Sequence, residues 1–88
     1  MRSRTINVKN PTGLHARPAS DFTAAAAKYS SSITLKRAGT EDEYNAKSIV
    51  MLLALGLEPG EEAVLTADGP DEAEAVEALT SLVDSFDE

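Results

Sequence analysis

The apolar residues of this 88-residue chain change their spacing several times, and this alternation limits its possible folds more than any other feature. Every second residue is apolar around Ile6 and Val8 and again around Ile33 and Leu35, which predicts strands with one buried face. A similar pattern follows Gly60. Residues 41–46 show a weaker pattern, which predicts a short strand at the edge of the sheet. The predicted strands are residues 4–9, 33–36, 41–46 and 61–68.

Segments with helical spacing separate or follow these strands. A first helix is predicted from Ala16 to about Tyr29, because its apolar residues recur every three or four positions. Ser48 is a good N-cap for a short second helix that ends at Gly56. A last helix is expected to begin with Pro70 as its first helical residue. Its apolar stripe consists of Val76, Leu79, Leu82, Val83 and Phe86.

The resulting order, β-α-β-β-α-β-α, predicts an α+β protein with an antiparallel sheet and helices on one face of it. The two middle strands are expected to form a hairpin. Residues 1–88 are predicted to form a single domain, because a chain of this size buries only about 60% of its surface and supports one modest core. The content of apolar residues, 42%, is that of a globular chain rather than a disordered one.

Charge is distributed unevenly along the chain. Residues 1–37 contain seven Lys or Arg and one acid, whereas residues 38–88 contain one Lys and fourteen acids. The net charge of −7 makes nucleic acid a poor partner, while the basic first third is expected to attract an acidic protein or a phosphate.

Composition also excludes several classes of site. The chain has no cysteine and one histidine, so we expect no disulfide, no metal site and no other cofactor. The longest apolar run, residues 49–55, is much shorter than the ~20 residues that span a bilayer. The first ten residues lack the apolar region of a signal peptide, which predicts a cytoplasmic protein without membrane insertion.

The only histidine lies where the first helix is expected to begin. A helix start leaves N–H groups without helical partners, and Ser, Thr, Asp or Asn usually caps them. His15 is a poor cap, so its position suggests chemistry rather than stability. The N–H groups of Ala16 and Arg17, the Arg17 guanidinium and the helix dipole together favour phosphate binding. Neutral imidazole is a competent nucleophile, which makes His15 a candidate phosphoryl acceptor.

The residues alone leave a second interpretation open. A histidine that is simply exposed or satisfied, without any chemical role, fits the same spacing, and Arg17 would then be a solvated helix residue. His15 as a general base would need an orienting acid, and Asp21, nearly two turns away, cannot easily reach back to it. A stand-alone enzyme is therefore not expected.

The stretch Gly13-Leu14-His15-Ala16-Arg17-Pro18-Ala19 resembles the active-site motif of the HPr family of histidine-containing phosphocarriers, which serve the bacterial sugar phosphotransferase system. Residues 45–49, 55–57 and the acidic last helix resemble the second half of these proteins, so the similarity covers essentially the whole chain. The resemblance implies an open-faced β-sandwich of four antiparallel strands under three helices. It implies that enzyme I phosphorylates His15 on Nδ1, assisted by Arg17, and that enzyme IIA domains receive the phosphoryl group.

In many Gram-positive relatives, the serine that matches Ser48 is phosphorylated by an HPr kinase/phosphorylase, and the product is a corepressor for a catabolite-control transcription factor. Ser48 is thus a candidate regulatory site, although its role as a helix cap needs no kinase. Other relatives keep this serine without that kinase. The sequence also departs from the Gram-positive pattern Ile-Met-Gly-Val-Met, because residues 49–53 read Ile-Val-Met-Leu-Leu.

The short second helix has apolar residues on two sides, but a helix on a sheet buries only one. We expect Ile49, Val50 and Leu53 to form an exposed docking patch beside His15; the other interpretation is that all of them are core. The cations expected around this patch are Arg17, Lys28 and Lys47.

A monomer is expected, since a carrier must present one face to several partners. The alternative function is a regulatory binding protein of the same fold that works through Ser48, and His15 argues against it, because purely regulatory relatives lack that histidine. A nitrogen-related phosphotransfer branch is a further alternative.

Overall fold

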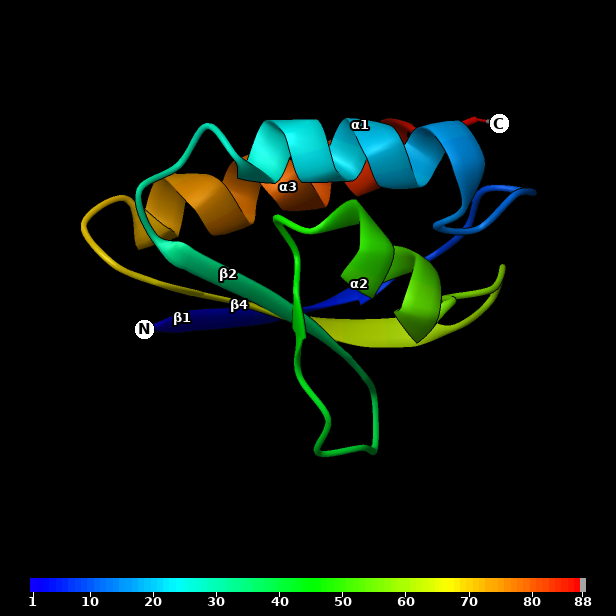
Figure 1. Ribbon diagram of the computed structural model, residues 1–88, viewed down its shortest axis with the longest axis horizontal. Coiled ribbons are helices and arrows are strands. Elements are labelled where there is room, and N and C mark those ends of the chain that lie inside the picture. Colours follow the sequence, from blue (N-terminus) through cyan, green and yellow to red (C-terminus); the bar gives the residue numbers. More distant parts are fainter. Residues whose placement is uncertain (88) are drawn as a thin grey trace.

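Four antiparallel strands form one sheet in a computed structural model that describes residues 1–87. The strands lie in the order β1 (Arg2–Asn7), β4 (Glu62–Asp68), β2 (Ser32–Arg37) and β3 (Tyr44–Asn45) (Figure 1). In β4 and β2, buried residues alternate with less buried ones, so the sheet has one covered face. The predicted hairpin of the two middle strands is confirmed, with β3 at the sheet edge.

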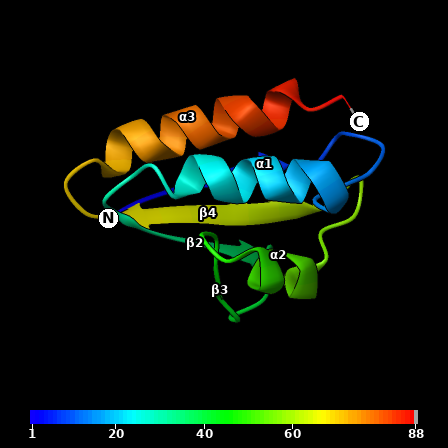
Figure 2. The same ribbon diagram turned by 45° about the horizontal axis from the view of Figure 1, so that its top comes forward.

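Three helices complete the fold: α1 (Ala16–Ala26), α2 (Ile49–Leu55) and α3 (Glu72–Ser85). Figures 1 and 2 show α1 and α3 side by side over the sheet, with α3 packed on β1 and β4. The short helix α2 contacts α1 and the edge strand β3. Side chains from all layers meet in one core, of which Phe22, Leu35, Leu65 and Leu79 are fully buried. The predicted α+β fold with four antiparallel strands and three helices is confirmed.

Several predicted boundaries were wrong. Strand β1 occupies residues 2–7 instead of 4–9, because its partner β4 begins at Glu62, which pairs with Asn7. The weak third strand shrinks from residues 41–46 to Tyr44–Asn45, since three consecutive exposed acids precede it. Helix α1 ends at Ala26 instead of about Tyr29, and its last turn tightens through a hydrogen bond from the Tyr29 N–H to the Ala26 carbonyl.

The start of α3 also differs from the prediction. The helix begins at Glu72, with Asp71 at the N-cap position, so Pro70 is not its first residue. The Asp71 carboxylate accepts hydrogen bonds from the backbone N–H groups of Ser30 and Ser31, at 2.9 and 3.0 Å. These amides lie in the turn that leads into β2. The Asp71 side chain therefore stabilises this turn and makes no capping hydrogen bond to its own helix. No helix among residues 1–87 has the length and apolarity needed to cross a membrane.

Candidate functional site

The loop that carries the histidine is attached to the segment after α2 by close backbone contact. Leu14 is buried, and its N–H donates to the Leu57 carbonyl at 2.9 Å. Gly13 has a φ of 75°, and a Cβ atom at that position would lie 2.6 Å from the same carbonyl oxygen. The side chain of Asn10 closes the turn by donating to the Gly13 carbonyl at 2.9 Å. The loop before His15 therefore requires glycine at position 13.

His15 occupies the N-cap position of α1, as predicted, and its side chain makes no capping hydrogen bond. Its backbone is extended, and the following residue, Ala16, has a φ of 51° in the left-handed region. Such a conformation costs a residue other than glycine about 1–2 kcal/mol, and strain of this kind tends to occur at functional sites. Within residues 1–87, the Ala16 N–H has no acceptor, which leaves it available to an anion.

The imidazole of His15 is paired with a carboxylate that sequence reasoning missed. Nε2 of His15 lies 2.8 Å from Oε2 of Glu58, and the two side chains are 33% and 63% exposed. Because an ionised carboxylate only accepts hydrogen bonds, Nε2 must carry the proton and donate it. The neutral ring then has its lone pair on Nδ1, which makes Nδ1 its nucleophilic atom.

Glu58 belongs to a segment with well-defined hydrogen bonds. Its backbone N–H donates to the Glu61 carboxylate at 2.7 Å. Glu61 in turn accepts two hydrogen bonds from the Arg37 guanidinium, at 2.6 and 3.1 Å. This bidentate pair is the main cause of a Glu61 pKa lowered to about 2. Arg37 also donates to the carbonyls of Leu55 and Gly56, which caps the end of α2.

The cations expected near the histidine have different environments. Arg17 is exposed at the second position of α1, and Lys28 is exposed beyond its C-terminal end. The ammonium of Lys47 donates to the Tyr29 carbonyl at 2.7 Å, so it binds the turn that follows α1. Part of the basic first third is also neutralised, because Lys9 pairs with Asp84 at 3.3 Å and Arg37 pairs with Glu61.

The second helix exposes the apolar residues that the sequence singles out. Val50 is 72% exposed, Leu53 is 46% exposed, and Ile49 is 37% exposed, whereas Leu52 and Leu55 are buried. Met51, which was not predicted, is 36% exposed. We call Ile49, Val50, Met51 and Leu53 the α2 patch. The prediction that one side of the helix is buried and the other exposed is confirmed.

Ser48 lies next to the α2 patch and caps the helix as predicted. Its hydroxyl oxygen accepts a hydrogen bond from the Met51 N–H at 3.3 Å. Gly56 ends the helix in the left-handed conformation, with a φ of 62°. These are the expected start and stop signals of a short helix.

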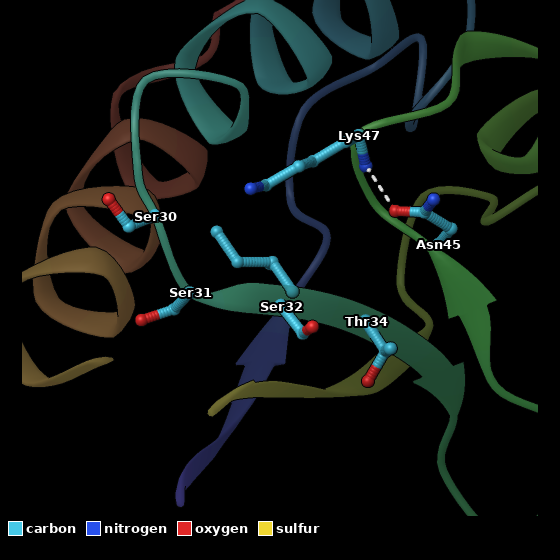
Figure 3. Close-up of a pocket in the computed structure, with 7 residues that line it drawn as sticks. Ser30, Ser31, Ser32, Thr34, Asn45 and Lys47 are labelled. Carbon is cyan, nitrogen blue, oxygen red and sulfur yellow. Dashed lines mark hydrogen bonds between the residues drawn. The ribbon is translucent and has the colours of Figure 1, made fainter. Parts of the chain in front are cut away.

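A polar pocket of about 220 Å³ is lined by residues that follow the C-terminal end of α1, so it lies at the other end of this helix from His15. Figure 3 shows the residues that line it. Serines 30–32, Thr34, Asn45 and Lys47 line it together with Ile33. Its only charged group, the Lys47 ammonium, is hydrogen-bonded to the Tyr29 carbonyl, and the Asn45 side chain accepts from the Lys47 N–H. This pocket is therefore separate from the histidine and brings no reactive group to a ligand. No three acidic or histidine side chains among residues 1–87 come close enough to hold a metal ion.

Comparison with known proteins identifies this arrangement. The sequence pattern described as the PTS HPr component phosphorylation site matches residues 2–85. Phosphocarrier protein HPr of Neisseria meningitidis serogroup A is 36% identical over 86 residues, covering 98% of this chain and 94% of that protein. The HPr-like protein Crh of Bacillus subtilis is 40% identical over 83 residues, covering 94% of this chain and 95% of that protein.

Solved structures agree with these relatives. A crystal structure of HPr from Thermoanaerobacter tengcongensis superposes with a TM-score of 0.91 at 45% identity, covering 97% of this chain and 93% of that one. The crystal structure of an HPr dimer from the same bacterium gives a TM-score of 0.74, covering 97% and 95% of the two chains.

An open four-stranded sheet under three helices, with a histidine at the start of the first helix, is thus the fold of a phosphocarrier protein and not of a stand-alone enzyme. The chain belongs to the HPr family of the phosphotransferase system. The family resemblance inferred from residues 13–19 is confirmed.

Proposed function

We propose that His15 accepts a phosphoryl group from phospho-enzyme I and donates it to enzyme IIA domains. The observation that carries this proposal is the position of His15 at an uncapped helix start, one-third exposed and followed by an Ala16 N–H that has no acceptor within residues 1–87. In the transfer, Nδ1 of His15 forms the bond to phosphorus while the donor's bond to phosphorus breaks and its electron pair leaves with the donor. The Nε2 proton remains on the ring, and the reverse displacement passes the group on.

We infer that the phosphoryl oxygens bind the backbone N–H groups of Ala16 and Arg17 and the Arg17 guanidinium. A helix start offers N–H donors and a positive dipole end, and a guanidinium matches phosphate geometry. Family membership supports this assignment, since the chain shares the histidine-to-proline motif of residues 15–18 on which the family resemblance rests.

The test is phosphorylation by enzyme I and phosphoenolpyruvate. Wild type should take up one phosphate that is labile in acid and stable in alkali, and His15→Ala should take up none. Arg17→Ala should retain uptake at a reduced rate. A wild type that accepts no phosphate from an enzyme I of its own organism would exclude the carrier function.

We propose the α2 patch as the surface on which enzyme I and enzyme IIA domains dock. The apolar side chains Ile49, Val50 and Leu53 are exposed on α2, which contacts α1, and α1 begins immediately after His15. Exposed apolar groups on so small a protein are typical of binding surfaces, and Arg17 and Lys28 supply positive charge for acidic partners. Lys47 contributes less to this charge, because its ammonium binds the Tyr29 carbonyl.

Substitution within α2 separates docking from chemistry. Leu53→Glu should raise the KM for phosphorylation by enzyme I at least tenfold while leaving phosphorylation by a small donor unchanged. Ala73→Glu is the matched control, because it adds the same charge at an exposed position of α3. Equal KM values for the two variants would exclude the α2 patch as the docking surface.

Ser48 is a proposed regulatory phosphorylation site for an HPr kinase/phosphorylase, and the product would bind a catabolite-control transcription factor. A phosphate on Ser48 would add a charge of about −2 beside the exposed Ile49 and Val50 and weaken apolar docking. Incubation with such a kinase and ATP should give an acid-stable phosphate that Ser48→Ala lacks. No acid-stable phosphate in the wild type would exclude this regulation.

The same assay tests a second function, that of a regulatory binding protein, because the Crh relative is 40% identical to this chain. In that case the protein is a regulatory binding protein, and phosphate appears on Ser48 but not on His15. A nitrogen-related branch would instead show uptake from that branch's own enzyme I. Transfer from the sugar-branch enzyme I to His15 distinguishes the carrier function from both.

The organisation that we propose is a single HPr-like domain formed by residues 1–88, working as a monomer in the cytoplasm. The shared core of the helices and the sheet supports one folding unit. A mass near 9.3 kDa in sedimentation equilibrium would support the monomer, and a mass of twice this value would contradict it.

A further inference from the structure

We infer that Glu58 is a positioning residue for His15, which orients the ring so that Nδ1 takes up the phosphoryl group and stabilises the positive ring that results. This inference rests on the proposed phosphoryl relay. It concerns a carboxylate 43 positions away in the sequence, and it follows from the contacts around Glu58 alone.

The contact determines which ring nitrogen is free. Oε2 of Glu58 accepts the hydrogen bond from Nε2 at 2.8 Å, so Nε2 keeps its proton and Nδ1 keeps its lone pair. The His15 ring also lies near Gly56, where an added Cβ atom would be 3.8 Å from Cε1 of the imidazole. The hydrogen bond to Glu58 and the nearby Gly56 together limit rotation of the ring.

The backbone of Glu58 is itself held in position. Glu61 accepts from the Glu58 N–H, Arg37 binds Glu61 through two nitrogens, and Arg37 also binds the carbonyl of Gly56. Each bond belongs to a charged group, and bonds of this kind are the stronger ones in proteins. Glu58 is thus a surface glutamate whose main chain has a defined position, although its side chain is 63% exposed.

The same contact favours transfer. When Nδ1 forms its bond to phosphorus, the ring becomes a cation that still carries the Nε2 proton, and the electron pair of the broken bond leaves with the donor. A carboxylate hydrogen-bonded to Nε2–H stabilises this cation, as an acid behind a catalytic histidine does. The phosphoryl group is on the other side of the ring, so its repulsion from Glu58 acts over a longer and more solvated path.

The first measurement concerns the unphosphorylated protein, so it does not depend on the relay. Nitrogen-15 NMR of His15 near pH 8 should give a protonated Nε2 and an unprotonated Nδ1 in the wild type. Exchange of the Nε2 proton with water should be at least threefold faster in Glu58→Ala. Glu62→Gln is the control, because Glu62 is an exposed neighbour on β4 and its loss changes the net charge equally. Equal exchange rates in wild type and Glu58→Ala would overturn the inference.

The second measurement concerns transfer from phosphoramidate, which phosphorylates imidazole without a protein partner. Glu58→Gln should lower the rate at Nδ1 by about three- to fivefold, the size expected for a partly exposed charged pair. Glu61→Gln should lower it less, because Glu58 stays present and only the charge of the group that accepts its N–H is removed. Glu62→Gln should leave it unchanged. A Glu58→Gln rate equal to that of Glu62→Gln would also overturn the inference.

The two proposals fail in different ways. If Nε2 exchange depends on Glu58 but enzyme I transfers no phosphate to wild type, the positioning contact stands and the relay fails. If wild type is phosphorylated at the same rate as Glu58→Gln by both donors, the relay stands and Glu58 has no positioning role.

Discussion

Replacement of Gly13 by alanine tests whether close backbone contact positions the histidine loop. Gly13 has a φ of 75°, and its added Cβ atom would lie 2.6 Å from the Leu57 carbonyl oxygen. Gly39 has a φ of 85° but nothing within 4 Å of its added Cβ atom. The two alanine variants therefore share the cost of a left-handed backbone and differ in the steric contact.

The magnitudes follow from this difference. A left-handed alanine costs about 1–2 kcal/mol, partly offset because glycine loses about 0.5–1 kcal/mol more backbone entropy on folding. We expect Gly39→Ala to lower the free energy of unfolding by about 1 kcal/mol. Gly13→Ala adds about 1–3 kcal/mol of overpacking, which gives about 2–4 kcal/mol in total.

Urea denaturation of both variants at pH 7 measures these free energies. For a chain of this size, 1 kcal/mol corresponds to a change in Tm of about 4–8 °C, so the variants are also separable by calorimetry. Gly13→Ala should in addition change the NMR shifts of His15 and Glu58, because the contact at Leu57 joins their two segments. Equal losses of stability in Gly13→Ala and Gly39→Ala would refute the steric argument.

Three further predictions concern the core, the cap of α2 and the Arg37–Glu61 pair. Phe22→Ala should lower the free energy of unfolding by about 3–5 kcal/mol in urea denaturation, because the ring is fully buried. Ser48→Ala should lower it by about 0.5–1 kcal/mol by removing the acceptor of the Met51 N–H, without changing phosphoryl transfer to His15 from phosphoramidate. Because Arg37 holds the folded-state pKa of Glu61 at about 2, below its ordinary value of 4.5, the pair stabilises the fold above about pH 4.5. That stabilisation should be lost as the pH falls towards 2, so urea denaturation of wild type and Glu61→Gln should differ at pH 7 and converge at low pH.

The fold was largely predictable because each element carries its own local signal. Alternation in residues 33–36 and 61–68 predicted the central strands, and Ser48 and Gly56 correctly bounded α2. The exposed side of α2 was also predictable, since a short helix on a sheet buries only one stripe.

Both errors in the helix bounds occur where a side chain binds a distant part of the chain. Pro70 satisfied the local rule for a first helical residue, but Asp71 binds the amides of Ser30 and Ser31, and α3 begins after it. Helix propensity extended α1 to about Tyr29, where a carbonyl is instead bound by Lys47. Local pattern contains no information about such pairs, because their members are separated by 18 to 41 positions.

In the candidate site, too, the residue with a local sequence signal was predictable and its distant partner was not. His15 was identifiable because it violates a local rule, namely the usual choice of an N-cap residue. Glu58 violates no rule: a glutamate before Pro59-Gly60 is an ordinary turn residue, and nothing in its neighbours indicates a histidine partner. In the sequence, the acid nearest to His15 is Asp21 on the same helix, whereas the acid that pairs with the ring, Glu58, lies in the segment after α2. The signal that would have found it is spatial: Leu14 pairs with Leu57, so the residues that follow each of them are brought together.

This pairing explains why an uncapped helix start is tolerated here. The first turn of α1 lacks a capping side chain and includes a left-handed Ala16, which together are unfavourable. The buried Leu14, the glycine contact at Leu57 and the buried Phe22 anchor the chain immediately before and after that turn. Because the anchors stabilise the loop from outside, the His15 side chain is not needed to cap its own helix. It is free to pair with Glu58 through Nε2 and to keep Nδ1 for a phosphoryl group.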